Sequence, residues 1–292
     1  MKTSPYLLLT LTSLFWAGNF VIARAVHADI PPISLAFWRW TIALMILLPF
    51  VTRHIISQRT LLLQNWKRIV LLSMLGVAGF NTFIYLGVQY TSATNALLLN
   101  SFIPMLTIII TWLFQGQHLS MKQIFGVIIS IFGVATIISR GDINLLSSME
   151  LNYGDMLVMV AVIFWAIYTT VLKGLPHEIN RLGFMGVIAL LGVLMLTPFY
   201  LWELSLDSHT ELTSSTLLTF AYVGLFPSVL AMLFYNRGVV EVGPAKASLF
   251  IHLMPVFGTV MSILFLNEIV QSFHLIGIGL IFTGIYFSLI RS

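Results

Sequence analysis

The chain has 292 residues, of which 59% are hydrophobic and 8% are charged. Soluble domains carry roughly 25% charged residues, and this sequence has too little polar surface to cover one large soluble core. The net charge of +4 matters less than where the basic residues lie, and no nucleic acid is expected as a partner. Cysteine is absent, which excludes a disulfide framework and a thiolate metal site.

Apolar runs separated by polar breaks predict ten transmembrane helices, because a helix needs about 20 mostly apolar residues to cross a bilayer. The alternation that a closed β-barrel needs is missing, so helices are the remaining way to satisfy the backbone in hydrocarbon. In chain order, the predicted spans are Tyr6–Arg24, Ile33–Val51, Ile69–Gln89, Thr94–Phe114, Met121–Ser139, Gly154–Lys173, Leu182–Leu201, Thr216–Tyr235, Ala245–Leu266 and Phe273–Ile290.

The basic residues between these spans predict the orientation of the chain. Cytoplasmic ends of transmembrane helices carry an excess of Lys and Arg. Placing the N-terminus in the cytoplasm puts ten of the 14 basic residues on that side, and the C-terminus then lies there too. The ten are Lys2, Arg53, Arg59, Lys67, Arg68, Lys122, Lys173, Arg181, Arg237 and Arg291.

The second half of the chain repeats the first. Phe15-Trp16-Ala17 recurs as Phe164-Trp165-Ala166, 149 positions later. Further matches at offsets of 149 to 151 are Pro49 with Pro198, Gly87 with Gly238, Pro104 with Pro255, Gly126 with Gly277 and Gly133 with Gly284. Five spans are an odd number, so the second copy has to be inverted relative to the first. The sequence therefore predicts two inverted five-helix repeats, residues 1–140 and 150–292.

The prolines of the fourth and ninth predicted spans point to a site at mid-depth. Pro104 and Pro255 each break the helical hydrogen-bond ladder, and one turn before them lie Asn100-Ser101 and Ile251-His252. Polar groups at two facing helix breaks would form a solute site between the halves, lined by spans one, three, four, six, eight and nine. The alternative is that the prolines only set helix curvature for packing.

Three ionisable residues within the spans have two interpretations each. His252 either binds solute or carries a coupling proton, or it only hydrogen-bonds a neighbouring helix. Lys246 either attracts an anionic group or extends its ammonium to the interface. Arg39 lies deeper between two tryptophans, which favours a structural aromatic–cation cluster or a place in an outer gate.

Aromatic residues and one further polar residue are candidates for the walls of the site. Trp16 and Trp165 are the strongest pair because they occupy equivalent positions of the two repeats. The other candidates are Asn19, Tyr85, Tyr168 and Tyr235. Trp and Tyr also gather at membrane interfaces, so each of them alone is also explained by packing.

Glycines spaced by seven residues mark one face of the fifth and tenth predicted spans. They are Gly126 with Gly133 and Gly277 with Gly284. Small residues let helices approach closely, so we expect these faces to pack within a dimer or against the other repeat.

Several motifs together resemble the EamA-type ten-helix members of the drug/metabolite transporter superfamily, over nearly the whole chain. They are Phe15-Trp16-Ala17-Gly18-Asn19-Phe20, Phe37-Trp38-Arg39-Trp40, Thr91 to Ala96 before Pro104, Val242 to Ala247 before Pro255, and Leu266-Asn267-Glu268. The first copy has Gly116-Gln117 where that family usually has glutamate. The resemblance implies export of amino acids or other metabolites and says almost nothing about the substrate.

The function predicted from these observations is secondary transport of small metabolites across a bacterial-type inner membrane, by alternating access. No phosphate-binding loop, nucleophile elbow or metal-binding motif is present, so neither ATP, a cofactor, a metal nor enzymatic catalysis is expected. The alternatives are a lipid-carrier flippase and a multidrug efflux protein. Expected partners are a small-molecule solute, membrane lipid and a second copy of the chain in a homodimer.

Overall fold

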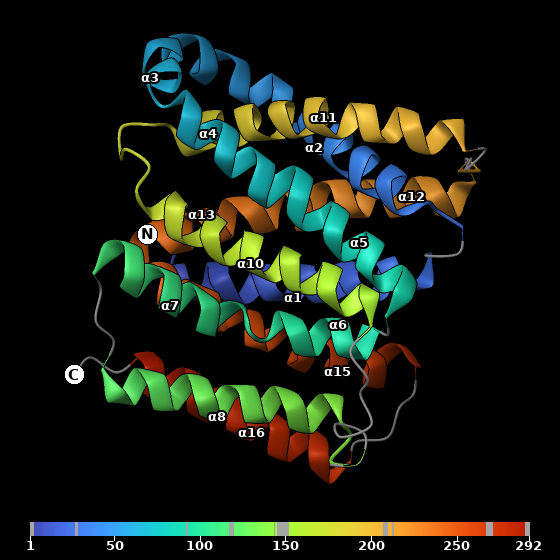
Figure 1. Ribbon diagram of the computed structural model, residues 1–292, viewed down its shortest axis with the longest axis vertical. Coiled ribbons are helices and arrows are strands. Elements are labelled where there is room, and N and C mark those ends of the chain that lie inside the picture. Colours follow the sequence, from blue (N-terminus) through green and yellow to red (C-terminus); the bar gives the residue numbers. More distant parts are fainter. Residues whose placement is uncertain are drawn as a thin grey trace.

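The computed structural model describes residues 3–26, 29–91, 93–116, 120–142, 144, 152–206, 210–211, 213–266 and 271–289. Within these ranges the regular structure is all helical, and the long helices run side by side along one axis of the molecule (Figure 1). Asn267 and Glu268, which contributed to the family resemblance, and Gln117, which departs from it, lie outside the described residues.

In the first half, the helices are α1 (Pro5–Ala25), α2 (Pro32–Ser57), α3 (Arg59–Gln64), α4 (Trp66–Ser73), the π-helical η1 (Met74–Gly79), α5 (Phe80–Tyr90), α6 (Ala93–Asn100), α7 (Ile103–Gln115) and α8 (Met121–Ile138). The second half contains α10 (Tyr153–Lys173), α11 (Arg181–Ser205), α12 (Ser214–Val223), the π-helical η2 (Gly224–Leu230), α13 (Ala231–Val242), α14 (Pro244–Leu249), the 3₁₀ turn η3 (Phe250–His252), α15 (Leu253–Leu266) and α16 (Ser272–Leu289).

Eight helical segments of the described chain are long and apolar enough to cross a membrane. They are Pro32–Ser57, Trp66–Tyr90, Asn95–Gln115, Met121–Ile138, Tyr153–Lys173, Arg181–Ser205, Ser214–Val242 and Ser272–Leu289. An all-helical integral membrane protein is thereby confirmed. The count of ten spans stays a prediction, because α1 and the α14–α15 segment are not among the eight.

Local sequence explains where several helices begin. Pro5 and Pro32 stand in the first turns of α1 and α2, where a missing N–H costs no hydrogen bond. Before α8, the Ser120 side chain accepts from the Gln123 backbone N–H while the Gln123 side chain accepts from the Ser120 N–H. Such reciprocal caps satisfy backbone donors that have no partner within the helix.

The structure interrupts the fourth and ninth predicted spans where the prolines indicate. Pro104 and Pro255 each lie in the first turn of a new helix, α7 and α15, instead of in the middle of one kinked helix. Between α6 and α7 the chain turns at Ser101–Phe102, and before α15 it passes through η3. The third and eighth spans are also irregular, because η1 and η2 interrupt them at equivalent positions. The sequence analysis did not predict these two π-helical segments.

Equivalent helix pairs pack in the two halves. α1 lies against α13 and α15, as α10 lies against α5 and α7, and α2 packs along α11. α8 and α16 pack against each other and form one edge of the bundle in Figure 1. Their close approach depends on glycine: a Cβ added at Gly133 would lie 2.7 Å from the Gly277 carbonyl oxygen. The predicted glycine faces therefore pack against each other within one chain.

We expect Gly277→Ala to destabilise the protein and Gly279→Ala, on the same helix, to leave its stability almost unchanged. A Cβ at Gly277 would lie 2.8 Å from the Gly133 carbonyl oxygen, whereas nothing lies within 4 Å of one at Gly279. Overpacking of this kind costs about 1–3 kcal/mol. Thermal unfolding in detergent checks the pair, and equal melting temperatures would contradict the packing described.

Candidate functional site

A cavity lies in the middle of the bundle, lined by residues from both halves. Its lining comes from α1, α2, η1, α5, α6 and α7 of the first half and from α10, α13, η3 and α15 of the second. The predicted spans one, three, four, six, eight and nine all contribute, and α2 contributes in addition. The cavity has a volume of about 30 Å³, which admits water but is well below the roughly 150 Å³ of a cavity that binds benzene. It must widen before a metabolite fits.

Aromatic side chains form one wall of the cavity. Trp16 of α1 and Trp165 of α10 meet edge to face, with ring centroids 5.1 Å apart. Phe80 packs against Trp165 at 4.6 Å, and the Trp16 indole donates to the Pro227 carbonyl oxygen at 3.1 Å. The two tryptophans that the repeat places at equivalent positions therefore build a single surface, which suits an apolar part of a solute.

The polar part of the cavity centres on Arg39 of α2, which is 4% exposed. Arg39 lies close to the aromatic surface, because it and Trp16 donate to the same carbonyl oxygen, that of Pro227. Its guanidinium group donates to five acceptors: Ser228 Oγ at 2.5 Å, Asn81 Oδ1 at 2.8 Å, Tyr85 Oη at 2.9 Å, the Pro227 carbonyl oxygen at 3.3 Å and Asn19 Oδ1 at 3.5 Å. The network joins α2, α1 and α5 to η2, and so joins the two halves.

Asn100, at the end of α6, is the other polar side chain of the lining, and it is 3% exposed. Neither its Oδ1 nor its Nδ2 has a hydrogen-bond partner among the described residues. A buried amide without partners is costly. This position therefore suits a polar group supplied by a solute or by water.

His252 is fully buried but does not line the central cavity. Its Nδ1 lies 2.5 Å from Ser130 Oγ and its Nε2 lies 2.8 Å from the Ser101 carbonyl oxygen. Because a carbonyl oxygen only accepts, Nε2 carries the hydrogen, and the Ser130 hydroxyl donates to Nδ1. The imidazole thus links α8, η3 and the turn between α6 and α7. This geometry favours the structural interpretation of His252.

The other predicted site residues lie around the cavity without lining it. Tyr168 stacks on Trp165, with its hydroxyl donating to Asn236 Oδ1 at 2.7 Å. Tyr235 packs on both tryptophans and hydrogen-bonds Thr169 at 2.9 Å. A second, smaller pocket of about 10 Å³ is lined by Asn100 together with Ser101, His252 and Pro255. Lys246 is half-buried near the start of α14, and Pro104 lies in the first turn of α7. Of the predicted residues, Trp16, Asn19, Tyr85, Asn100 and Trp165 come together in the lining.

Sequence analysis left two central residues out of the candidate site. Arg39 was assigned to a structural aromatic–cation cluster or a gate because Trp38 and Trp40 flank it, and its Cζ does lie 5.7 Å from the centroid of the Trp40 ring. Asn81 was not considered. One signal points to Asn81: it precedes Tyr85 by four residues, and residues four apart lie on the same helix face. Within the described chain, no group of three or more His, Asp or Glu side chains is arranged to hold a metal ion.

Comparison with known proteins identifies the family of the chain. The EamA-like transporter family matches the chain twice, over residues 3–139 and 152–290. The chain belongs to this family. It is a membrane transporter of the drug/metabolite transporter superfamily rather than an enzyme.

Several relatives align over nearly the full length of this EamA-like transporter. The uncharacterized transporter YyaM of Bacillus subtilis (strain 168) is 25% identical over 96% of this chain and 92% of its own. YetK of the same organism is 28% identical over 99% of this chain and 88% of its own. An uncharacterized transporter of Archaeoglobus fulgidus is 26% identical over 98% of this chain and 97% of its own. A solved crystal structure shares the fold, with a TM-score of 0.75 at 15% identity over 99% of this chain and 97% of that one.

We expect His252→Ala and His252→Gln to lower stability without changing the pH dependence of transport. Either substitution leaves a buried hydrogen-bonding group of Ser130 or Ser101 without its partner, at about 1–3 kcal/mol. Thermal unfolding and transport measured across pH values check this. Normal stability combined with a lost pH dependence would instead assign His252 to proton coupling.

Proposed function

We propose that this chain is a secondary transporter that moves small metabolites, amino acids or related compounds, across a bacterial-type inner membrane. The observation that carries the proposal is the cavity between the halves, whose lining combines aromatic side chains with buried polar groups. Such a combination suits a small solute with an apolar part and a polar head. Export is the favoured direction because of the family resemblance.

The closed cavity supports transport by alternating access. At about 30 Å³ it has no room for a metabolite, so the surrounding helices have to move to admit one. The π-helical segments η1 and η2 and the breaks before α7 and α15 lie in spans that line the cavity. Irregular helices of this kind often occur at functional sites. They are the positions at which we expect the helices to bend.

The proposed architecture has ten spans, with α1 and the α14–α15 segment crossing the membrane beside the eight apolar segments. Both termini then lie in the cytoplasm, and the two halves are inverted repeats. The equivalent packing of α1 with α13 and of α10 with α5 supports this arrangement. The glycine faces of α8 and α16 are filled by each other, so the proposed homodimer would use another surface.

Substrate screening in reconstituted vesicles, with and without a pH gradient, tests the proposed function. We expect Trp165→Ala and Asn100→Leu to reduce transport about 10-fold or more, because each removes a lining contact worth about 1–3 kcal/mol. The matched control is Trp202→Ala, since Trp202 is 58% exposed on α11. Equal losses in the control and the cavity variants would contradict the placement of the site.

Cysteine labelling from each side of the membrane tests the ten-span topology in this cysteine-free chain. We expect a membrane-impermeant thiol reagent to label Thr3→Cys and Glu178→Cys from the cytoplasm, and Asp142→Cys and Gln271→Cys from outside. All four positions are exposed. If α1 does not cross, Thr3 and Asp142 are labelled from the same side. If the α14–α15 segment does not cross the membrane, Glu178→Cys and Gln271→Cys are labelled from the same side.

A further inference from the structure

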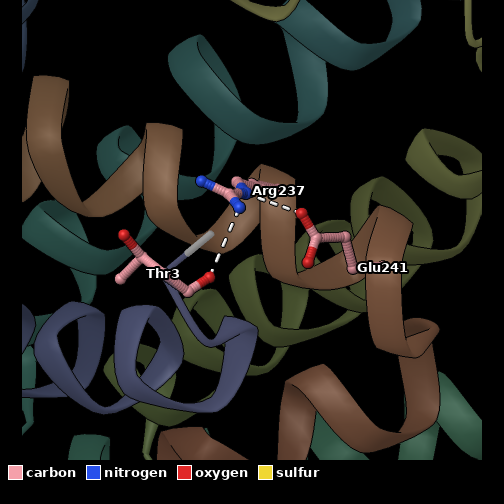
Figure 2. A network of polar contacts seen from close by, with 3 residues as sticks. All are labelled: Thr3, Arg237 and Glu241. Carbon is pink, nitrogen blue, oxygen red and sulfur yellow. Dashed lines mark hydrogen bonds and ion pairs between the residues drawn. The ribbon is translucent and has the colours of Figure 1, made fainter. Parts of the chain in front are cut away.

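Arg39 is a buried cation that has no acidic partner among the described residues. Among the described residues, an ion pair joins Arg237 to Glu241 at 2.6 Å, and both of these side chains are 39% exposed (Figure 2). Arg237 also donates to the Thr3 carbonyl oxygen, so a surface arginine has a carboxylate while the arginine at the cavity has none. Charged residues at membrane depth are costly and mark substrate pathways.

Every group that accepts a hydrogen bond from Arg39 is neutral. Hydroxyl, amide and carbonyl oxygens solvate the guanidinium group, but they do not neutralise its charge. Within the described structure, Nη2 makes one hydrogen bond, to the Pro227 carbonyl oxygen at 3.3 Å, and a terminal guanidinium nitrogen carries two hydrogens. Arg39 therefore retains both a charge and a donor for an anionic ligand.

The polar side of the cavity departs from the repeat. At the offsets of 149 to 151 that relate the two halves, the first-half lining residues Asn19, Arg39, Asn81 and Asn100 correspond to Tyr168, Ile188, Met232 and Ile251. Three of these four counterparts are apolar, and Met232 and Ile251 themselves line the cavity. A ligand with two unlike ends needs the polar set only once, which agrees with this asymmetry.

We propose that Arg39 binds the carboxylate of a small solute that carries a single anionic group and whose apolar part lies against Trp16 and Trp165. Asn100, whose amide has no partner in the described structure, supplies a second polar contact to the same solute. Arg39 is the only cation among the lining residues of the described chain. A phosphate dianion would leave one negative charge unpaired in this apolar surrounding, which is unfavourable. The assignment rests on the proposed transport function and names its substrate class.

Binding and transport of matched solutes test this assignment. The panel contains phenylacetate with phenylacetamide, leucine with leucinamide, phenyl phosphate, and a set of neutral and cationic metabolites. Quenching of tryptophan fluorescence reports binding because Trp16, Trp40 and Trp165 line the cavity, and uptake into reconstituted vesicles reports transport. We expect the wild-type protein to prefer a carboxylate over its amide.

The variants are Arg39→Gln, Arg39→Lys and, as the matched surface control, Arg237→Gln. A hydrogen bond to a charged group accounts for about a 10-fold to 100-fold difference in affinity. We therefore expect Arg39→Gln to weaken carboxylate binding by at least about 10-fold, Arg39→Lys to retain part of it, and Arg237→Gln to retain all of it. Fluorescence titration of folded protein keeps the test valid where a variant yields less protein.

The outcomes separate the two proposals. A wild-type protein that transports no solute of the panel contradicts the proposed function. A wild-type protein that transports solutes without preferring carboxylates, or whose carboxylate affinity is unchanged in Arg39→Gln, overturns the Arg39 assignment alone. Preference for phenyl phosphate over both carboxylates also overturns it, because the single cation was assigned to a group with one negative charge.

Discussion

Hydrocarbon offers no hydrogen bonds, so every polar group inside this bundle has to find its partner within the protein. That constraint explains where the irregular parts of the helices lie. The break between α6 and α7 is held by His252, which donates to the Ser101 carbonyl oxygen and accepts from Ser130. The guanidinium group of Arg39 is surrounded by oxygens from α2's neighbours in both halves. Asn100 is left without such a partner in the described structure, and it faces the cavity.

The two repeats divide the tasks of scaffold and site. Some features pair equivalent positions of the two halves, such as the glycine contacts of α8 with α16 and the edge-to-face contact of Trp16 with Trp165. The buried cation occurs once, because the residue of the second half equivalent to Arg39 is Ile188. The cavity is therefore lined by equivalent aromatic residues but by an unequal set of polar ones.

Much of the fold follows from the sequence because the bilayer restricts it so strongly. Apolar runs predicted the helices, and Pro104 and Pro255 predicted the breaks, since their effects are local. The π-helical segments were not predicted, because η1 contains no proline and the effect of Pro227 in η2 was not considered. The predicted contact of Arg39 with a flanking tryptophan is present, because its Cζ lies 5.7 Å from the centroid of the Trp40 ring. Its hydrogen-bond partners Asn81 and Ser228, which were not predicted, are 42 and 189 positions away. Contacts of that separation are determined by packing and cannot be derived from local spacing.

The central claim is that a transported solute binds in the cavity between the two halves. An experimental structure of the protein with a solute that it transports tests this most directly. We predict density for the solute against Trp16 and Trp165, with its polar head directed toward Arg39 and Asn100. The account would be contradicted by density for the solute at another position, combined with unchanged positions of these four side chains.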